Sequence, residues 1–169
     1  MYLNSHQIMS KGITINTDAS LHPEIKLGGY AFTIACDNFK ISKSGKFKNK
    51  IYFSHHAEIM AIGNALATLL KKNPLPTFEW LVINTDCIAA MCAMSTPKDD
   101  VGYRVQKMLF ELLEKSKIKK YSVKHVKAHT TGEEPRDLAN KWCDRESRRE
   151  MREAVMLKSL VLRGELQLK

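Results

Sequence analysis

Two apolar runs in this chain alternate like β-strands and end on the same tetrapeptide, Ile-Asn-Thr-Asp. The first run covers residues 13–18 and ends on Asp18, and the second covers residues 79–86 and ends on Asp86. The carboxyl ends of strands are common positions for functional side chains in α/β sheets. If the two strands pair in parallel, their carboxylates come close together, and they repel each other unless a cation lies between them. The repeated tetrapeptide therefore predicts a site for a divalent metal ion.

Three further segments have the composition of β-strands. Residues 28–36 alternate β-branched and aromatic side chains. Asp37-Asn38 predicts a turn into a third strand at residues 39–48, and residues 121–128 are expected to form the last strand. The third strand carries four lysines. Lysines on an exposed strand prevent edge-to-edge pairing, and they also bind a phosphate backbone, so both explanations stay open.

Residues 55–72 carry apolar side chains at helical spacing, and Ser54 is expected to be the N-cap of this helix. Glu58 falls within the apolar stripe, in line with Ile62. A buried acid is costly unless it is paired or bound to a cation. An acid in the first turn also suits the helix dipole, whatever face it occupies. That effect does not explain an acid on the buried face, so Glu58 is a candidate metal ligand.

Three more helices are expected in the second half of the chain. A short one covers residues 87–94 and is ended by the segment around Pro97. An amphipathic helix follows at residues 101–117, and its apolar stripe is assigned to the core. The final helix begins at Pro135, which suits a first helical turn, and continues to about residue 160.

This order of elements predicts an α/β fold built on a mixed five-stranded sheet. Strands one to three form an antiparallel meander, and strands one, four and five run parallel, with right-handed crossovers. Helices are expected on both faces of the sheet. The length of 169 residues suits a single domain, with a core at about residues 12–150 and a C-terminal helix and tail at residues 151–169.

The formal net charge of +9 fits a polyanionic partner such as nucleic acid, although basic charge can also serve solubility alone. The polar N-terminus lacks the apolar core of a signal peptide, and no apolar run is long enough to span a membrane. The four cysteines lack the paired C-x-x-C spacing of a zinc site. We therefore expect a cytoplasmic protein with reduced thiols, without membrane attachment, and monomeric unless the C-terminal tail mediates self-association.

Asp18, Glu58, Asp86 and an acid on the final helix could converge at one end of this sheet. Carboxylate oxygens are hard ligands that suit Mg²⁺ or Mn²⁺ better than zinc. Two such ions about 3.5–4 Å apart can clamp an in-line displacement at phosphorus. The acids together with the basic charge therefore predict a metal-dependent phosphodiesterase.

Five short motifs, taken in order, resemble those of the type 1 ribonuclease H family over residues 13–147. They are Thr17-Asp18-Ala19-Ser20, Ala57-Glu58-Ile59-Met60-Ala61, Thr85-Asp86-Cys87, Val126-Lys127-Ala128-His129 and Asn140-Lys141-Trp142-Cys143-Asp144. The resemblance implies a ribonuclease H-like fold. It also implies an endonuclease that uses two Mg²⁺ ions, with Mn²⁺ as a possible substitute. Such an enzyme cuts the RNA strand of RNA–DNA hybrids and leaves a 5′-phosphate and a 3′-hydroxyl.

The resemblance also implies a role for each matching residue. Asp18 corresponds to the carboxylate that bridges both metals, and Glu58, Asp86 and Asp144 to the other metal ligands. His129 corresponds to a histidine that shuttles protons or aids product release, a task suited to a group that titrates near neutral pH.

Asp137 competes with Asp144 for the fourth ligand position. The two acids are seven residues apart, so they lie on nearly the same face of a helix. Asp137 falls in the first turn, where the helix dipole gives an acid a sufficient structural reason, so we favour Asp144.

Other readings of the sequence remain open. Candidates for substrate binding are the third-strand lysines, His55-His56 and the arginines of the final helix, although a solvated face is the favoured interpretation of those arginines. Another metal-dependent nuclease on the same fold, resolvase- or transposase-like, is the main alternative function. A non-catalytic nucleic-acid-binding module is a further alternative, but the presence of all four acids and His129 gives it no support.

Overall fold

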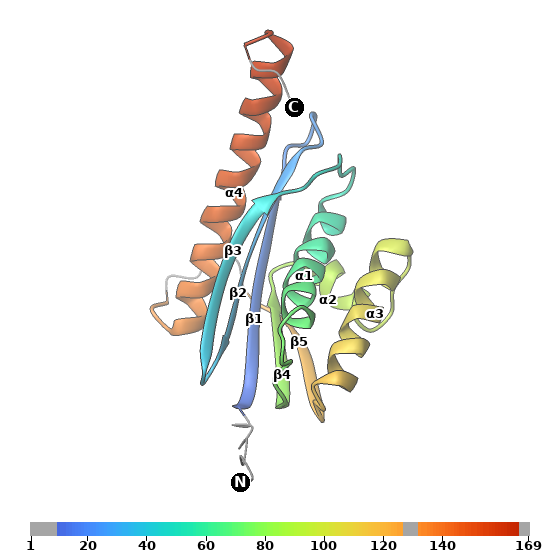
Figure 1. Ribbon diagram of the computed structural model, residues 1–169. Helices are drawn as coiled ribbons and strands as arrows, with labels where there is room; N and C mark the ends of the chain where they lie inside the picture. Colours follow the sequence, from blue (N-terminus) through green and yellow to red (C-terminus); the bar gives the residue numbers. More distant parts are fainter. Residues whose placement is uncertain (1–9, 127–131, 166–169) are drawn as a thin grey trace.

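The computed structural model describes residues 10–126 and 132–165, and these form a five-stranded mixed sheet (Figure 1). The strands are β1 (Ser10–Leu21), β2 (Gly28–Cys36), β3 (Phe39–Lys46), β4 (Phe78–Thr85) and β5 (Lys120–His125). Their order across the sheet is β3-β2-β1-β4-β5. The pairs β1–β2 and β2–β3 are antiparallel, and the pairs β1–β4 and β4–β5 are parallel. The predicted fold class and strand directions are thus confirmed.

Helices cover both faces of this sheet (Figure 1). Helices α1 (Ser54–Leu70), α2 (Ile88–Ala93) and α3 (Asp100–Lys115) lie on one side, and α4 (Pro135–Leu162) lies on the other. Within the described residues, no helix is both long enough and apolar enough to cross a lipid bilayer.

The hydrophobic core lies between the sheet and α1, with α3 packed behind α1. It is made of the inward residues of β1, β2 and β4 together with the apolar stripes of α1 and α3, all of them almost fully buried: Ile13, Ile15, Phe32, Ile34, Ile59, Ile62, Leu66, Leu69, Leu81, Ile83, Leu109 and Leu112. Burial of side chains this size contributes about 1.5–3 kcal/mol each. This core fixes α1, and with it Glu58, against the carboxyl end of β1.

The opposite face of the sheet is polar and close to α4. The Asn84 side-chain amide donates to Asn16 Oδ1 at 2.9 Å, and the Asn16 amide donates to Thr33 Oγ1 at 3.1 Å. All three residues are buried. Buried polar groups are costly unless they are paired, so this chain of hydrogen bonds across β4, β1 and β2 specifies their relative register.

Helix α4 approaches the backbone of β2 closely at Gly29. A Cβ atom placed on Gly29 would lie 2.5 Å from the Glu150 Cβ and 2.5 Å from the Ser147 carbonyl oxygen. Such distances are shorter than van der Waals contact, so only glycine allows this approach. The glycine thereby places the middle of α4 directly beside the end of β1.

Most element boundaries agree with the sequence prediction within two or three residues, but the expected N-cap of α1 is wrong. Ser54 is the first helical residue, and Phe53 occupies the N-cap position in an extended conformation without a side-chain hydrogen bond. By contrast, the Asp99 side chain caps α3 by accepting from the Gly102 amide at 2.9 Å. Local sequence gives both serine and aspartate as good caps, and the tertiary position of the chain decides which one is used.

Candidate active site

Three predicted carboxylates meet at the carboxyl end of the parallel strands. Asp18 lies near the end of β1, Asp86 directly follows β4, and Glu58 lies in α1. One carboxylate oxygen from each residue lies within 4.8 Å of the others. The register explains the meeting of the aspartates, because Ile15 pairs with Ile83 and Asn16 with Asn84, which aligns the two repeated tetrapeptides.

The surroundings of the Glu58 carboxylate favour binding of a cation. Its Oε1 accepts a hydrogen bond from the Ala19 amide at 3.2 Å. Its Oε2 is buried and has no hydrogen-bond partner among the described residues. Burial raises the pKa of Glu58 well above its ordinary value, and the nearby charges of Asp18 and Asp86 add to this effect. An orphaned carboxylate oxygen facing two other acids fits a divalent cation and would be costly without one.

Asp18 is held by both neighbouring layers of the fold. Its carboxylate accepts a hydrogen bond from the Ser147 hydroxyl on α4. Burial raises the pKa of Asp18 to about 7, with smaller contributions from the charges of Asp86 and Asp144, and against the lowering effects of Ser147 and Arg148. Without a cation, the cluster therefore retains a proton near neutral pH, whereas a bound divalent ion would favour full ionisation.

The geometry favours Asp144 over Asp137 as a fourth ligand. Asp144 lies one turn before Ser147 on α4, and its charge acts on Asp18. It is about one-third exposed, and its Oδ1 pairs with Arg148 Nη2 at 2.8 Å. Asp137 lies about 10 Å further toward the start of the helix, and its buried carboxylate lies against Gly132.

His129, the predicted proton shuttle, lies outside the described residues.

Two residues that contact the site were not predicted from the sequence. Ser147 holds Asp18, and its only signal was its position three residues after Asp144 on the same helix. His125, at the end of β5, contacts the Asp86 backbone carbonyl oxygen through Nε2 at 3.0 Å. The sequence placed His125 inside a strand and gave no sign of this contact.

A model of the RNase H family matches residues 10–152 of the chain. The chain belongs to the RNase H family. The match covers both sequence motifs with the repeated tetrapeptide and most of α4. Members of this family are nucleases that act on RNA–DNA hybrids.

A solved structure with the same fold is the N-terminal RNase H domain of Rv2228c from Mycobacterium tuberculosis, determined as a fusion with maltose-binding protein. The similarity has a TM-score of 0.65 and covers 88% of this chain and 99% of that chain, at 14% sequence identity. At that identity the likeness supports the fold alone. A search of curated proteins gives no match to this RNase H.

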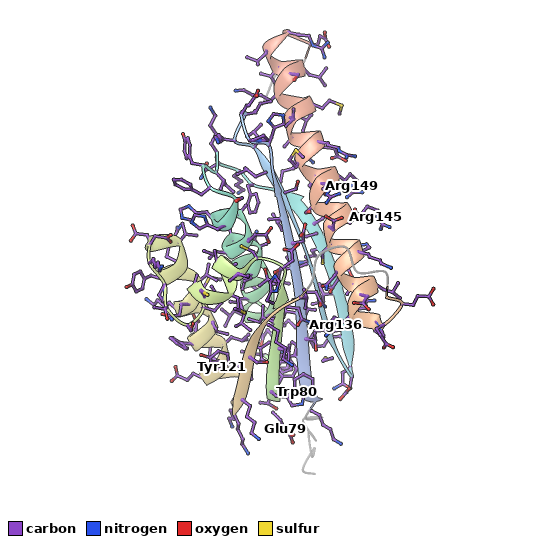
Figure 2. The ribbon with its side chains drawn as sticks, turned by 180° about the vertical axis from the view of Figure 1, so that it is seen from behind. Glu79, Trp80, Tyr121, Arg136, Arg145 and Arg149 are labelled. Atoms are coloured by element: carbon purple, nitrogen blue, oxygen red, sulfur yellow. The ribbon has the colours of Figure 1, made fainter. Side chains whose placement is uncertain are left out.

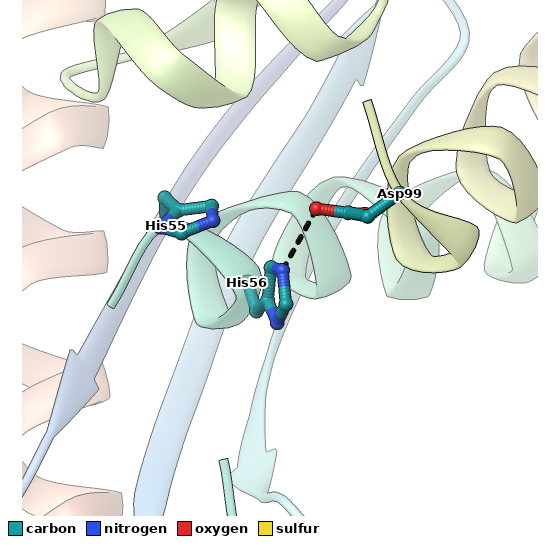
Figure 3. Close-up of side chains that lie close together, drawn as sticks. All are labelled: His55, His56 and Asp99. Carbon is teal, nitrogen blue, oxygen red and sulfur yellow. Dashed lines mark hydrogen bonds and ion pairs between the residues drawn. The ribbon is translucent and has the colours of Figure 1, made fainter. Parts of the chain in front are cut away.

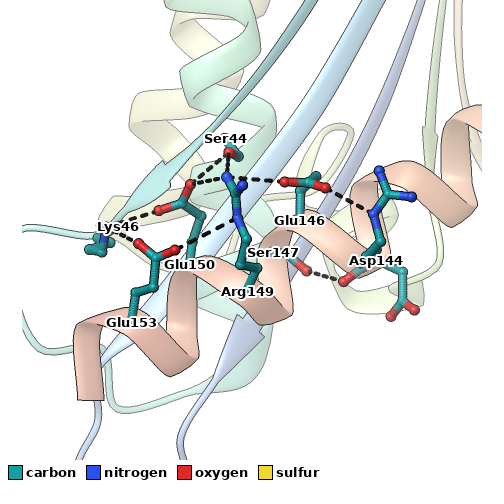
Figure 4. A network of polar contacts seen from close by, with 9 residues as sticks. Ser44, Lys46, Asp144, Glu146, Ser147, Arg149, Glu150 and Glu153 are labelled. Carbon is teal, nitrogen blue, oxygen red and sulfur yellow. Dashed lines mark hydrogen bonds and ion pairs between the residues drawn. The ribbon is translucent and has the colours of Figure 1, made fainter. Parts of the chain in front are cut away.

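The arginines of α4 in this RNase H are largely neutralised by neighbouring acids. Figure 2 shows Arg145 and Arg149 on α4. Arg145 pairs with Glu146 at 2.9 Å, and Arg149 pairs with Glu146 and Glu150 at 3.0 Å each. Figure 4 shows that this network continues from Glu150 to the β3 residues Ser44 and Lys46. The sequence favours a solvated face for these arginines, and Arg145 and Arg149 are indeed more than half exposed while they pair with acids.

Proposed function

We propose that this RNase H is an endoribonuclease that hydrolyses the RNA strand of RNA–DNA hybrids by two-metal-ion catalysis. Mg²⁺ is the expected metal and Mn²⁺ a substitute, and the products carry 5′-phosphate and 3′-hydroxyl ends. The observation that supports this proposal is the carboxylate cluster of Asp18, Glu58 and Asp86, with its ligand atoms within 4.8 Å and an unpaired, buried oxygen on Glu58.

The protein contributes a prearranged set of ligands. Asp18 lies between the α1 and α4 sides of the cluster, which suits the bridging position, and Ser147 fixes the direction of its carboxylate. Asp86 and Glu58 complete one side, and Asp144 the other. Asp18, Glu58, Asp86 and Asp144 would hold the divalent ions, which would promote attack by water and stabilise the leaving 3′-oxygen.

His129 follows β5, whose last residue already contacts the Asp86 segment. We assign to His129 the transfer of protons to or from the reacting phosphate, or help with product release, because an imidazole titrates near neutral pH.

The hybrid itself is held by cationic side chains that are not paired with acids. Lys46 is paired with Glu150 and Glu153, so the exposed Lys48, next to β3, is a better candidate than Lys46.

A substrate panel tests this function directly. Labelled RNA–DNA hybrid, duplex RNA, duplex DNA and a four-way junction would each be incubated with Mg²⁺, and in parallel with a chelator. We expect cleavage of the hybrid alone, in its RNA strand, and none with the chelator. An intact hybrid beside a cleaved junction or DNA duplex would instead identify another nuclease on the same fold. Binding without cleavage of any substrate would identify a non-catalytic module.

A further inference from the structure

A second group of metal-ligating side chains lies outside the carboxylate cluster, where the start of α1 meets the start of α3. His55 and His56 lie in the first turn of α1, and Asp99 is the N-cap of α3. Figure 3 shows the three side chains turned toward one another. One ligand atom from each lies within 4.8 Å of the other two.

Taken by itself, the contact between His56 and Asp99 has a structural explanation. His56 Nε2 lies 2.9 Å from Asp99 Oδ2, which ties α1 to α3. That explanation does not account for the position of the His55 side chain. Its ring lies 4.4 Å from the His56 ring and 5.6 Å from the Phe53 ring, and no hydrogen bond of its own is found among the described residues. A second imidazole is therefore directed at a pair that is already formed.

The backbone orients the carboxylate of this group. Asp99 Oδ1 accepts from the Gly102 amide at 2.9 Å, which leaves Oδ2 facing the two imidazoles. Residues that hold a ligand in place in this way are typical of metal sites. A pocket of about 180 Å³ adjoins the group, and its lining includes His55, Asp99, Cys92 and Lys98. The pocket leaves room for a further ligand such as water.

We propose that His55, His56 and Asp99 bind a divalent transition metal of the zinc class, at a site separate from the carboxylate cluster. Two imidazoles and one carboxylate are the ligands that zinc takes in open sites, whereas Mg²⁺ prefers oxygen ligands throughout. The fourth position faces the pocket. This site does not depend on the proposed nuclease function.

The His56–Asp99 pair needs little adjustment to hold such an ion, and the His55 ligand atom lies within 4.8 Å of both partners. Donor atoms about 2.0–2.1 Å from a tetrahedral zinc ion lie about 3.3 Å from each other. The contact between His56 and Asp99 would have to open by only a few tenths of an ångström from its 2.9 Å. The ion would take the place of the hydrogen shared by this pair and would bring His55 into the same link between α1 and α3.

Cobalt is a suitable probe, because tetrahedral Co²⁺ has visible absorption bands that are far stronger than those of octahedral Co²⁺. The protein would be titrated with Co²⁺ in excess Mg²⁺, which occupies the all-oxygen cluster. We expect one equivalent to bind with tetrahedral bands, and Zn²⁺ to displace it. His55→Gln, His56→Gln and Asp99→Asn should each weaken binding at least tenfold, because loss of even a residue that only orients a ligand costs about 10–100-fold.

Matched variants keep this test decisive. Asparagine caps helices as well as aspartate does, so Asp99→Asn should stay folded, which circular dichroism would check. Asp100→Asn, next to it in the exposed first turn of α3, should bind Co²⁺ like the wild type. Asp18→Asn should also bind normally. The proposal is wrong if no tetrahedral Co²⁺ appears, if the three ligand variants bind as well as the wild type, or if Asp18→Asn abolishes the bands.

Discussion

At Asp18, the stability of the metal-free protein and the ability to bind a metal ion make opposite demands. It is buried and faces two further acids, and Ser147 is its direct hydrogen-bond donor on α4. Burial of a charged group costs free energy that a nearby cation can return. The cluster is therefore expected to destabilise the metal-free protein while it provides the binding energy for the ion.

Replacement of Asp18 by Asn separates these two effects. Asp18→Asn removes one negative charge with little change of shape, so cleavage of the hybrid should fall by about 100-fold or more, consistent with a loss of several kcal/mol of metal-based stabilisation. Without metal, the thermal midpoint should stay the same or rise. Cleavage assays and melting curves in chelator would measure both. Normal turnover by this variant would remove Asp18 from the site.

The stability of the metal-free protein should also depend on pH through this residue. The pKa of Asp18 is raised to about 7, above its ordinary value, so the folded state holds a proton that the unfolded state has lost. Stability from this source is complete at pH values below about 4 and is lost as the pH rises through 7. The difference is at most about 4 kcal/mol. Melting curves in chelator should therefore shift downward between pH 5 and pH 8.

Mg²⁺ and the Asp18→Asn variant are the controls for this pH effect. Mg²⁺ should stabilise the protein more at pH 8 than at pH 5, because the ionised acids bind it better. The Asn variant in chelator should show a smaller downward shift than the wild type. An equal shift in both proteins would assign the pH dependence to other groups.

The fourth ligand can be decided with two variants of the same helix. Asp144→Asn should slow cleavage and weaken Mg²⁺ binding, because the Asp144 charge acts on Asp18. Asp137→Asn should leave cleavage nearly unchanged and cost a few tenths to about 1 kcal/mol of stability, through the lost interaction with the helix dipole. The opposite ranking in a cleavage assay would make Asp137 the ligand.

At the scale of elements, the repeated tetrapeptide and the alternation of the strands were sufficient to predict the sheet. Asn16 and Asn84 pair because the same pattern on β1 and β4 demands the same register. The sequence could not predict the contact of Ser147 with Asp18 or the contacts of Glu150 with Ser44 and Lys46, because these depend on how α4 lies on the sheet. Local patterns do not specify which side chains meet over such a separation, which is 129 positions for Ser147 and Asp18.

Gly29 tests whether α4 must lie against β2 for the site to form. In Gly29→Ala the added methyl group would overlap Glu150 and Ser147, so we expect a loss of about 1–3 kcal/mol of stability and weaker Mg²⁺ binding as α4 moves away. Gly102→Ala is the control, since the nearest atom to its added methyl is 3.1 Å away and alanine favours helix. Denaturant unfolding would measure both. Equal stability of the two variants would contradict this role of Gly29.

At the scale of the whole molecule, a net charge of +9 coexists with a helix on which Arg145, Arg148 and Arg149 are paired with acids. Because these three arginines are paired, the attraction for a polyanion should come mainly from lysines on other elements that are not engaged by acids. The overall charge therefore says little about which surface binds nucleic acid, and the pattern of ion pairs says more.

Salt dependence of hybrid binding would test this division of charges. With the non-cleaving Asp18→Asn protein, log affinity should fall linearly with log salt. Adding Lys48→Ala should reduce this slope by about 1, as expected for one lost phosphate contact. Adding Arg149→Ala should leave the slope unchanged, because Arg149 is bound to Glu146 and Glu150. Equal effects of the two substitutions would show that α4 contacts the backbone after all.

The pairing of two buried asparagines, Asn16 on β1 and Asn84 on β4, should constrain how this sequence can evolve. Asn16 and Asn84 satisfy each other, so an apolar substitution of either one leaves an amide of the other without its partner. Each position alone is then difficult to change, while a simultaneous exchange of both is tolerable. Among homologous sequences, these two sites should accordingly covary, although neither side chain belongs to the catalytic set.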